Sequence, residues 1–271
     1  MGELLAGVGR TKITPPVGTF LFGYIARERG AEAVHDDLFA TALVLDDGRI
    51  RIAVVSCDLL MLHPTTVAAI RERVHAQTGI PARNVMLCCS HTHSGPVTFV
   101  VQGGRGGGGG GLSPSTRPTG YVEGLAGLIA GAVVEAARDL GPAAWGVGRG
   151  KAEIGVNRRQ RSAGGAVIIG ADPEGVVDRD LLILRVDRVT GDGVGGDAPS
   201  PPATRPLALL VNCACHAVCL SGNSYLVSAD WPGAMRRAVE ARTGAAVCFV
   251  QGACADTNPL GGPQDTFDSA Q

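Results

Sequence analysis

Two histidines near the middle of the chain have the spacing of metal ligands. His91 and His93 lie in the string Ser-His-Thr-His-Ser-Gly-Pro over residues 90–96, which follows the apolar run 84–87. That run predicts a buried β-strand, and side chains two residues apart on a strand point the same way. Two such imidazoles could share one metal ion, or one could bind metal while the other moves protons. Two ordinary histidines at a surface turn would have the same spacing.

Further ionisable residues follow other predicted strands. Asp58 ends the strand 49–57, His216 ends the strand 207–215, and Asp256 comes soon after the strand 245–250. Ligands gather beyond the carboxyl ends of the strands in sheets of this class, and two of these strands end in three of the six histidines, so we expect His91, His93 and His216 to share a site. Zinc accepts neutral imidazoles and activates water near neutral pH, which makes it the expected metal.

The cysteines near these histidines allow two other interpretations. Cys213, Cys215 and His216 have some of the character of a structural zinc site. On a strand, however, the two cysteines share one face and the histidine takes the other, so buried small residues are favoured. A second interpretation is a nucleophilic cysteine that is activated by a histidine, in the pair Cys89–His91 or Cys215–His216. Such dyads rarely form between sequence neighbours. Elsewhere, His35 and Asp36 are interpreted either as a pair that orients the site or as an ordinary loop.

Composition limits the class of protein. The 271 residues are 45% hydrophobic and 18% charged, which allows a sizeable core, and the net charge is -1. We therefore expect no binding to nucleic acid driven by overall charge. The N-terminus lacks a basic region followed by an apolar segment, which predicts a cytoplasmic protein with reduced cysteines. Residues 121–140 are interrupted by charges and glycines, so they predict a packed helix and no transmembrane segment.

The pattern of apolar residues predicts an α/β fold, with α+β as the alternative: a mixed sheet with helices packed on it and the site at the strand ends. We expect one catalytic domain over residues 1–260, with flexible inserts at 102–120 and 190–206, and a disordered tail at 261–271. The expected strands are 7–14, 38–46, 49–57, 84–87, 144–148, 152–156, 180–189, 207–215 and 245–250, and the expected helices are 64–78, 121–140 and 231–243.

Taken together and in this order, these residues resemble the neutral/alkaline (non-lysosomal) ceramidase family, in its N-terminal catalytic domain. The most specific part is the His-Thr-His-Ser-Gly-Pro string. The resemblance extends over nearly the whole chain and includes Gly7–Pro16, His35–Asp36, Ser56–Asp58, Ser90–Pro96, Asn157–Arg158, Asn212–His216, Ser228–Asp230 with Gly233, and Gln251–Pro259.

The resemblance implies zinc-dependent hydrolysis of a linear amide, which in the best-known members is the N-acyl bond of ceramide. It implies that His91 and His216 bind Zn²⁺ and that His93 handles protons or the carbonyl oxygen. Arg158 would be the active-site arginine, and the substrate a small-molecule or lipid N-acyl compound.

The chain also departs from the family pattern. In the family, a glutamate and a tyrosine from later segments complete the zinc shell, and nothing here matches them. The resemblance therefore leaves three alternatives: the chain is a truncated domain, another residue such as Asp256 substitutes as a ligand, or the site is weak. Ala255 stands where the family usually has glycine, and a run of glycines follows Pro96. The alternatives are another metal-dependent hydrolase, such as an esterase or deacetylase, and a module without catalysis. The oligomeric state is left open.

Overall fold

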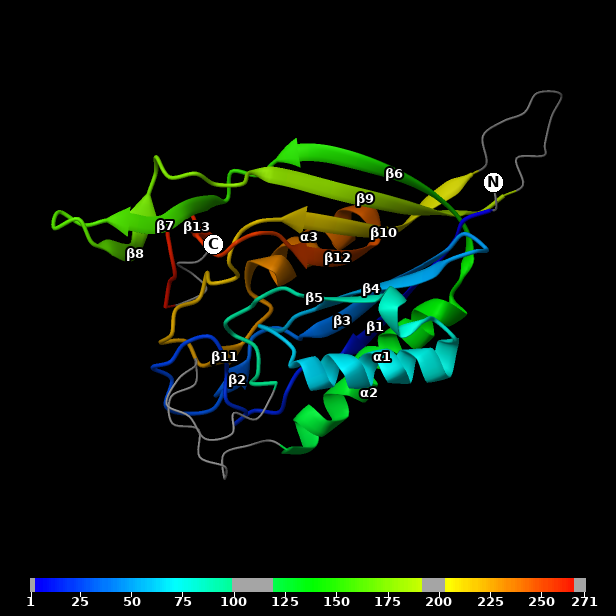
Figure 1. Ribbon diagram of the computed structural model, residues 1–271, viewed down its shortest axis with the longest axis horizontal. Coiled ribbons are helices and arrows are strands. Elements are labelled where there is room, and N and C mark those ends of the chain that lie inside the picture. The colour runs from blue at the N-terminus through cyan, green and yellow to red at the C-terminus, as the bar shows by residue number, and fades with distance from the viewer. Residues whose placement is uncertain (1–2, 99–118, 192–202, 266–271) are drawn as a thin grey trace.

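An eight-stranded mixed sheet carries the fold (Figure 1). The computed structural model describes residues 3–98, 119–191 and 203–265. The strand order is β12-β10-β9-β6-β1-β3-β4-β5. Neighbours are antiparallel except β4 with β5 and β10 with β12, which are parallel, so the predicted mixed sheet is confirmed. The strands are β1 (Leu5–Lys12), β3 (Phe39–Asp46), β4 (Arg51–Cys57), β5 (Val85–Cys89), β6 (Gly141–Lys151), β9 (Asp180–Val189), β10 (Thr204–Cys213) and β12 (Ala246–Gln251).

Smaller strands and four helical segments complete the described residues. A two-stranded sheet pairs β2 (Ala33–Val34) with β11 (Leu226–Val227), and a three-stranded sheet has the order β13-β7-β8. Its strands are β7 (Gly155–Arg161), β8 (Val167–Asp172) and β13 (Thr257–Pro259). The helices are α1 (Pro64–Thr78), α2 (Thr119–Arg138), α3 (Asp230–Thr243) and the short 3-10 helix η1 (Ala82–Asn84).

Local sequence signals place several elements correctly. The Asp46-Asp47-Gly48 turn joins β3 to β4 as a hairpin, with Gly48 at a φ of 81° and the Asp47 carboxylate accepting the Ile50 amide at 2.7 Å. Helix α1 has the predicted limits, because Gly79 ends it in the left-handed conformation that glycine tolerates. The predicted antiparallel pair of strands around the second insert is β9 with β10.

The two expected inserts and the tail are only partly described. Strand β10 begins at Thr204, inside the expected insert 190–206, because Thr204 pairs with Val189 of β9. Helix α2 likewise begins inside the insert 102–120. Disorder was also expected from residue 261, yet the amide of Gln264 donates to the Cys219 carbonyl at 2.7 Å. Residues 102–118, 192–202 and 266–271 lie outside the described residues.

Helix α2 lies so close to the sheet that only glycine fits beneath it. A Cβ atom on Gly9 of β1 would lie 2.2 Å from the Ala132 carbonyl oxygen of α2. By length and composition, residues Gly120–Arg138 could span a membrane, with a mean hydropathy of 1.3. Leu125 and Ile129 are instead fully buried in the main core, together with residues of α1, β3 and β4. The helix is therefore the core helix that the sequence predicted.

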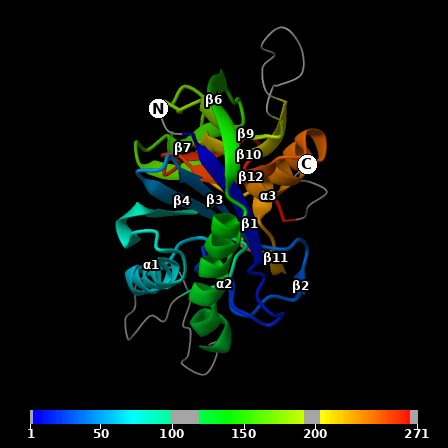
Figure 2. The same cartoon turned by 90° about the vertical axis from the view of Figure 1, so that its right-hand side faces the viewer.

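The sheet curls so that its two ends meet. The Ser56 hydroxyl of β4 donates to the Phe249 carbonyl of β12 at 2.8 Å and accepts the Phe249 amide at 3.1 Å. Between the ends lies a second core that includes Leu43, Val186 and Cys248. Helices α1 and α2 cover the outer face, whereas α3 packs beside β12 (Figure 2). The curl brings the carboxyl ends of β4, β5, β10 and β12 to one side of the molecule.

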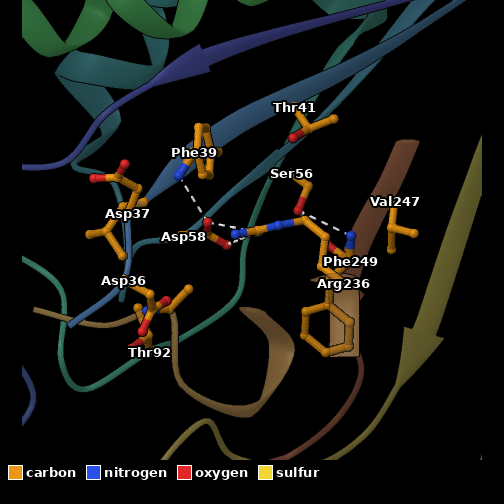
Figure 3. Close-up of polar contacts among 12 residues, drawn as sticks. Asp36, Asp37, Phe39, Thr41, Ser56, Asp58, Thr92, Arg236, Val247 and Phe249 are labelled. Carbon is orange, nitrogen blue, oxygen red and sulfur yellow. Dashed lines mark hydrogen bonds and ion pairs between the residues drawn. The ribbon is translucent and has the colours of Figure 1, made fainter. Parts of the chain in front are cut away.

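A buried ion pair fastens α3 to the sheet (Figure 3). Arg236 Nη1 lies 2.8 and 2.7 Å from the two carboxylate oxygens of Asp58, which also accept the Phe39 amide at 2.9 Å. The Asp58 side chain is only 1% exposed. Asp58, which follows the end of β4, therefore does not join the histidines, because its carboxylate points to Arg236 of α3.

Replacing Arg236 with methionine should lower the free energy of unfolding by about 3–5 kcal/mol, because the substitution leaves the Asp58 charge buried and unpaired. Urea denaturation followed by circular dichroism measures the loss. The matched control is Arg237→Met, which removes a half-exposed ion pair to Asp36 and should cost at most about 1 kcal/mol. Equal losses in the two variants would contradict the role given to the Asp58–Arg236 pair.

Candidate metal centre

The three histidines singled out from the sequence come together in space. His91 and His93 follow β5, and His216 follows β10. Their ring centres lie 5.0 Å apart for His91 and His216, 5.1 Å for His91 and His93, and 5.7 Å for His93 and His216. One ligand atom from each lies within 4.8 Å of the others. Nitrogens bound at about 2.1 Å to one zinc ion lie roughly 3.4 Å apart, so small side-chain rotations would close the group around a metal.

The backbone around His91 is a turn, and the predicted strand geometry was wrong. Strand β5 ends at Cys89, and His91 has a φ of 65°, which is uncommon for a residue other than glycine. Its amide donates to the Leu59 carbonyl at 2.9 Å, and the buried Thr92 hydroxyl donates to the Ser228 carbonyl at 2.9 Å. This turn, rather than the alternation of a strand, directs His91 and His93 into one space.

Backbone carbonyls orient two of the imidazoles. His91 Nδ1 lies 3.1 Å from the Leu60 carbonyl oxygen, and His216 Nδ1 lies 2.6 Å from the Cys254 carbonyl oxygen. Because a carbonyl only accepts, Nδ1 must carry the hydrogen in both rings, which leaves a lone pair on Nε2. Histidines that bind metals in proteins are held in this way by a second partner. His91 and His216 therefore each have a lone pair on Nε2 that could bind a metal ion.

His93 differs, because neither of its ring nitrogens has a hydrogen-bond partner although both are buried. Seven side-chain polar atoms are buried without a partner in the described residues, and four belong to Ser90, His93 and Ser94. Since such groups are rare in folded proteins, their concentration here indicates a site that is completed by an ion, water or substrate. The donor set of three imidazole rings fits a borderline cation such as Zn²⁺.

The three imidazoles are electrically neutral at neutral pH. Burial lowers the pKa of each ring, most strongly in His93, whose pKa falls to about 3. The positive charge of Arg158 lowers all three pKa values further, which places this guanidinium close to the cluster. Neutral imidazoles are the form that binds metal, so the site needs no deprotonation before loading at pH 7.

A strand that the sequence did not reveal links Arg158 to His216. Strand β13 pairs with β7, so that Asn157 lies opposite Thr257, and the Arg158 amide donates to the Asp256 carbonyl at 2.7 Å. The Thr257 carbonyl in turn accepts the His216 amide at 3.0 Å. Asp256 itself is outside the group of possible metal ligands found among the described residues, which gives no support to the expectation that it replaces a missing ligand.

The His35–Asp36 pair is linked to the histidine turn through the segment that contains Ser228. The Asp36 carboxylate accepts the Ser228 hydroxyl at 2.5 Å and the Ala229 amide at 3.0 Å, and it also lies 2.8 Å from His35 Nδ1. Ser228 is the residue whose carbonyl holds Thr92. Asp36 therefore supports the segment against which the His91–His93 turn packs.

Two residues beside His93 were not identified from the sequence. Arg27 is 3% exposed and donates from Nη1 to the His93 carbonyl, and the Tyr24 ring lies 5.1 Å from the His93 ring. Gly23 is required beside them, because a Cβ atom there would lie 2.5 Å from the His93 ring. Nothing in the local pattern of this loop, which contains glycine and aromatic residues, indicates that it wraps around a histidine 66 positions away.

The cysteine alternatives gain no support. All eight cysteines are free, and burial raises the pKa of both Cys89 and Cys215 to about 12. These thiols therefore stay protonated near neutral pH, whereas a nucleophile must be a thiolate. The metal-binding group found in the described residues contains histidines only.

In metal-free protein, lowering the pH from 7 to 5 should reduce the free energy of unfolding. The unfolded chain binds a proton at His93 below about pH 6.5, whereas the folded chain does so only near pH 3. This histidine alone therefore contributes a slope of up to about 1.4 kcal/mol per pH unit between these values. Urea titrations at several pH values measure the slope, and His93→Gln should make it shallower. Identical slopes for the two proteins would contradict the burial of a neutral His93.

Comparisons with known proteins identify the family and the fold of this chain. The family model described as "Neutral/alkaline non-lysosomal ceramidase, N-terminal" matches residues 4–255. The neutral ceramidase structure from Pseudomonas aeruginosa is similar in fold, with a TM-score of 0.73 at 20% identity over 100% of this chain and 42% of that chain. A structure titled "Ceramidase complexed with C2" gives 0.75 with the same identity and coverage. The chain thus spans less than half the length of these relatives. On the family match, it belongs to the neutral/alkaline non-lysosomal ceramidase family, within that family's N-terminal region.

Proposed function

We propose that this chain carries the metal-binding part of a hydrolase that cleaves a linear amide, ceramidase-like, in a lipid or other N-acyl substrate. Membership of the ceramidase family supports this class of reaction. The observation that carries the proposal is the arrangement of two oriented imidazoles, each with a free Nε2, beside a buried His93 without a hydrogen-bond partner.

His91 and His216 would hold the metal, which we propose to be Zn²⁺. When bound, zinc acts as a Lewis acid that activates water and polarises the substrate carbonyl. Catalytic zinc usually has three protein ligands, and His93 is the third member of the cluster. We assign His93 to the substrate rather than to the metal, because neither of its nitrogens is oriented by a carbonyl as those of His91 and His216 are.

His93 and Arg158 would act on the reacting amide. Hydrolysis adds water to the acyl carbon, breaks the C–N bond and returns a proton to the departing nitrogen. A neutral His93 has one N–H, which can hold the carbonyl oxygen, and one free nitrogen, which can accept a proton and pass it on. The charge of the Arg158 guanidinium lowers the pKa of all three imidazoles. The same charge would stabilise the negative charge that develops on the carbonyl oxygen.

Zinc binding tests the ligand assignment. Wild-type protein should take up about one zinc ion per chain at micromolar metal, measured by elemental analysis after dialysis. His91→Ala and His216→Ala should each weaken zinc roughly 100-fold or more, whereas His93→Ala should weaken it less than about tenfold. Uptake below about 0.2 zinc per chain in the wild type would contradict a metal site. A loss in His93→Ala as large as in His91→Ala would make His93 a ligand.

Catalysis is tested with zinc-loaded protein and a panel of N-acyl amides, including a ceramide, alongside the matching esters. We expect amide hydrolysis that a chelator abolishes. His93→Ala should lower kcat about 10²–10⁴-fold, because it removes the group that transfers the proton. Arg158→Ala should lower kcat about 10²–10³-fold, because it removes stabilisation of the oxyanion. The control is Arg159→Ala, an exposed neighbour that should leave the rate unchanged. Hydrolysis that persists in both His91→Ala and His216→Ala would contradict the proposed function.

A further inference from the structure

One glutamine side chain bonds to both segments that carry the oriented histidines. Gln251, the last residue of β12, donates from Nε2 to the Ser90 carbonyl at 3.1 Å and to the Cys215 carbonyl at 2.8 Å. Its Oε1 accepts the Cys215 amide at 3.4 Å. Ser90 and Cys215 directly precede His91 and His216 in the chain. The Gln251 side-chain amide therefore lies between the two segments and contacts the residue that precedes each histidine.

The chemistry of these contacts settles the orientation of the amide. Both partners of Nε2 are carbonyl oxygens, which only accept hydrogen bonds, so the nitrogen and not the oxygen must face them. The two hydrogens of the Gln251 amide are then both used, one for each segment. A carboxylate at this position has the same shape and offers no hydrogen.

The remaining backbone contacts hold each histidine to its own surroundings. The His91 amide bonds to Leu59, and the His216 amide bonds to Thr257. Between the two segments, the His93 amide donates to the Ala217 carbonyl at 3.2 Å, and Gln251 adds its bonds to Ser90 and Cys215. The residue after Gln251 also packs on the segment that carries Cys215, because the Gly252 amide donates to the Cys213 carbonyl at 2.9 Å and a Cβ atom on Gly252 would lie 3.1 Å from the backbone of Ala214.

We propose that Gln251 is a positioning residue that sets the separation of the His91 and His216 imidazoles, and through it the affinity of this pair for a divalent metal ion. The inference rests on the proposed function, because it takes these two histidines as the metal ligands. Groups that hold metal ligands in place from the next layer typically contribute 10- to 100-fold in metal affinity. Gln251 fits this role although it touches no imidazole.

Two variants separate shape from hydrogen bonding. Gln251→Glu keeps the size of the side chain but directs oxygen at two carbonyl oxygens, which repel it. Gln251→Leu removes the hydrogen bonds without adding charge. Ser56→Ala is the first control, because it loosens β12 through Phe249 without touching either histidine segment. Gln264→Leu is the second, because its side-chain amide donates to the nearby Gly261 carbonyl and, among the described residues, to neither histidine segment.

The experiment measures zinc affinity by competition with a chromophoric chelator, for the wild type and all four variants. The visible absorption of the Co²⁺-loaded proteins reports the geometry around the metal, and urea denaturation of the metal-free proteins reports stability. We expect Gln251→Glu and Gln251→Leu to weaken zinc about 10- to 100-fold and to change the Co²⁺ spectrum. Both controls should stay within about threefold of the wild-type affinity, whatever stability Ser56→Ala loses.

Two results would overturn the inference while leaving the proposed function standing. One is a wild type that binds zinc through His91 and His216 together with Gln251 variants within about twofold of its affinity. The other is an equal loss of affinity in Ser56→Ala, which would trace the effect to a loosened β12. A wild type that binds no zinc would instead overturn the proposed function, and the positioning role with it.

Discussion

The contact between the two ends of the eight-stranded sheet is the constraint on which the rest of the structure depends. Ser56 of β4 and Phe249 of β12 exchange hydrogen bonds although these strands stand near opposite ends of the strand order. The closure does not depend on Ser56 alone, because the second core with Leu43, Val186 and Cys248 packs inside the curled sheet. Because the sheet closes in this way, the loops after β5, β10 and β12 open into one space. His91 and His216 lie in the loops after β5 and β10, and Gln251 is the last residue of β12. The Asp58–Arg236 ion pair holds α3 against the sheet in the same region.

Most buried polar atoms of the described residues have hydrogen-bond partners, whereas several atoms at the histidine site have none. Its imidazoles are half-buried or buried, and the backbone of His91 has a conformation that few side chains favour. Such features lower stability and persist where the surrounding structure holds them in place, which is typical of functional sites. Here the surrounding structure consists of backbone carbonyls at Leu60 and Cys254 and the amide of Gln251. The result is a pair of neutral rings whose free nitrogens face a common space.

Much of the fold follows from local signals in the sequence. The Asp-Asp-Gly turn predicts the β3–β4 hairpin, Gly79 ends α1, and the apolar run 180–189 is β9. Strands β8 and β13 could not be found in this way. Most of β8 is exposed, so it has no apolar alternation, and β13 has three residues whose pairing with β7 depends on the tertiary fold. Arg158 was identified through family resemblance, and β13 is what places it beside His216.

The clustering of the histidines was predicted, but the strand geometry from which it was predicted is not the geometry in the structure. Alternation along a strand does not apply to His91 and His93, because β5 stops at Cys89 and the chain turns. The rule that polar residues gather beyond strand ends holds for His91 and His216 and fails for Asp58, whose partner Arg236 lies 178 positions away on α3. The roles of Gln251 and Arg27 likewise depend on contacts between distant segments, which a single sequence does not reveal.

The central claim is that Nε2 of His91 and Nε2 of His216 bind the same metal ion. X-ray diffraction from zinc-soaked crystals, recorded on both sides of the zinc absorption edge, tests it most directly. The account predicts one strong anomalous peak about 2.0–2.1 Å from both of these nitrogens, with the Nδ1 contacts to Leu60 and Cys254 intact. A peak bound to cysteine sulfur, or no peak within reach of both rings, would contradict it.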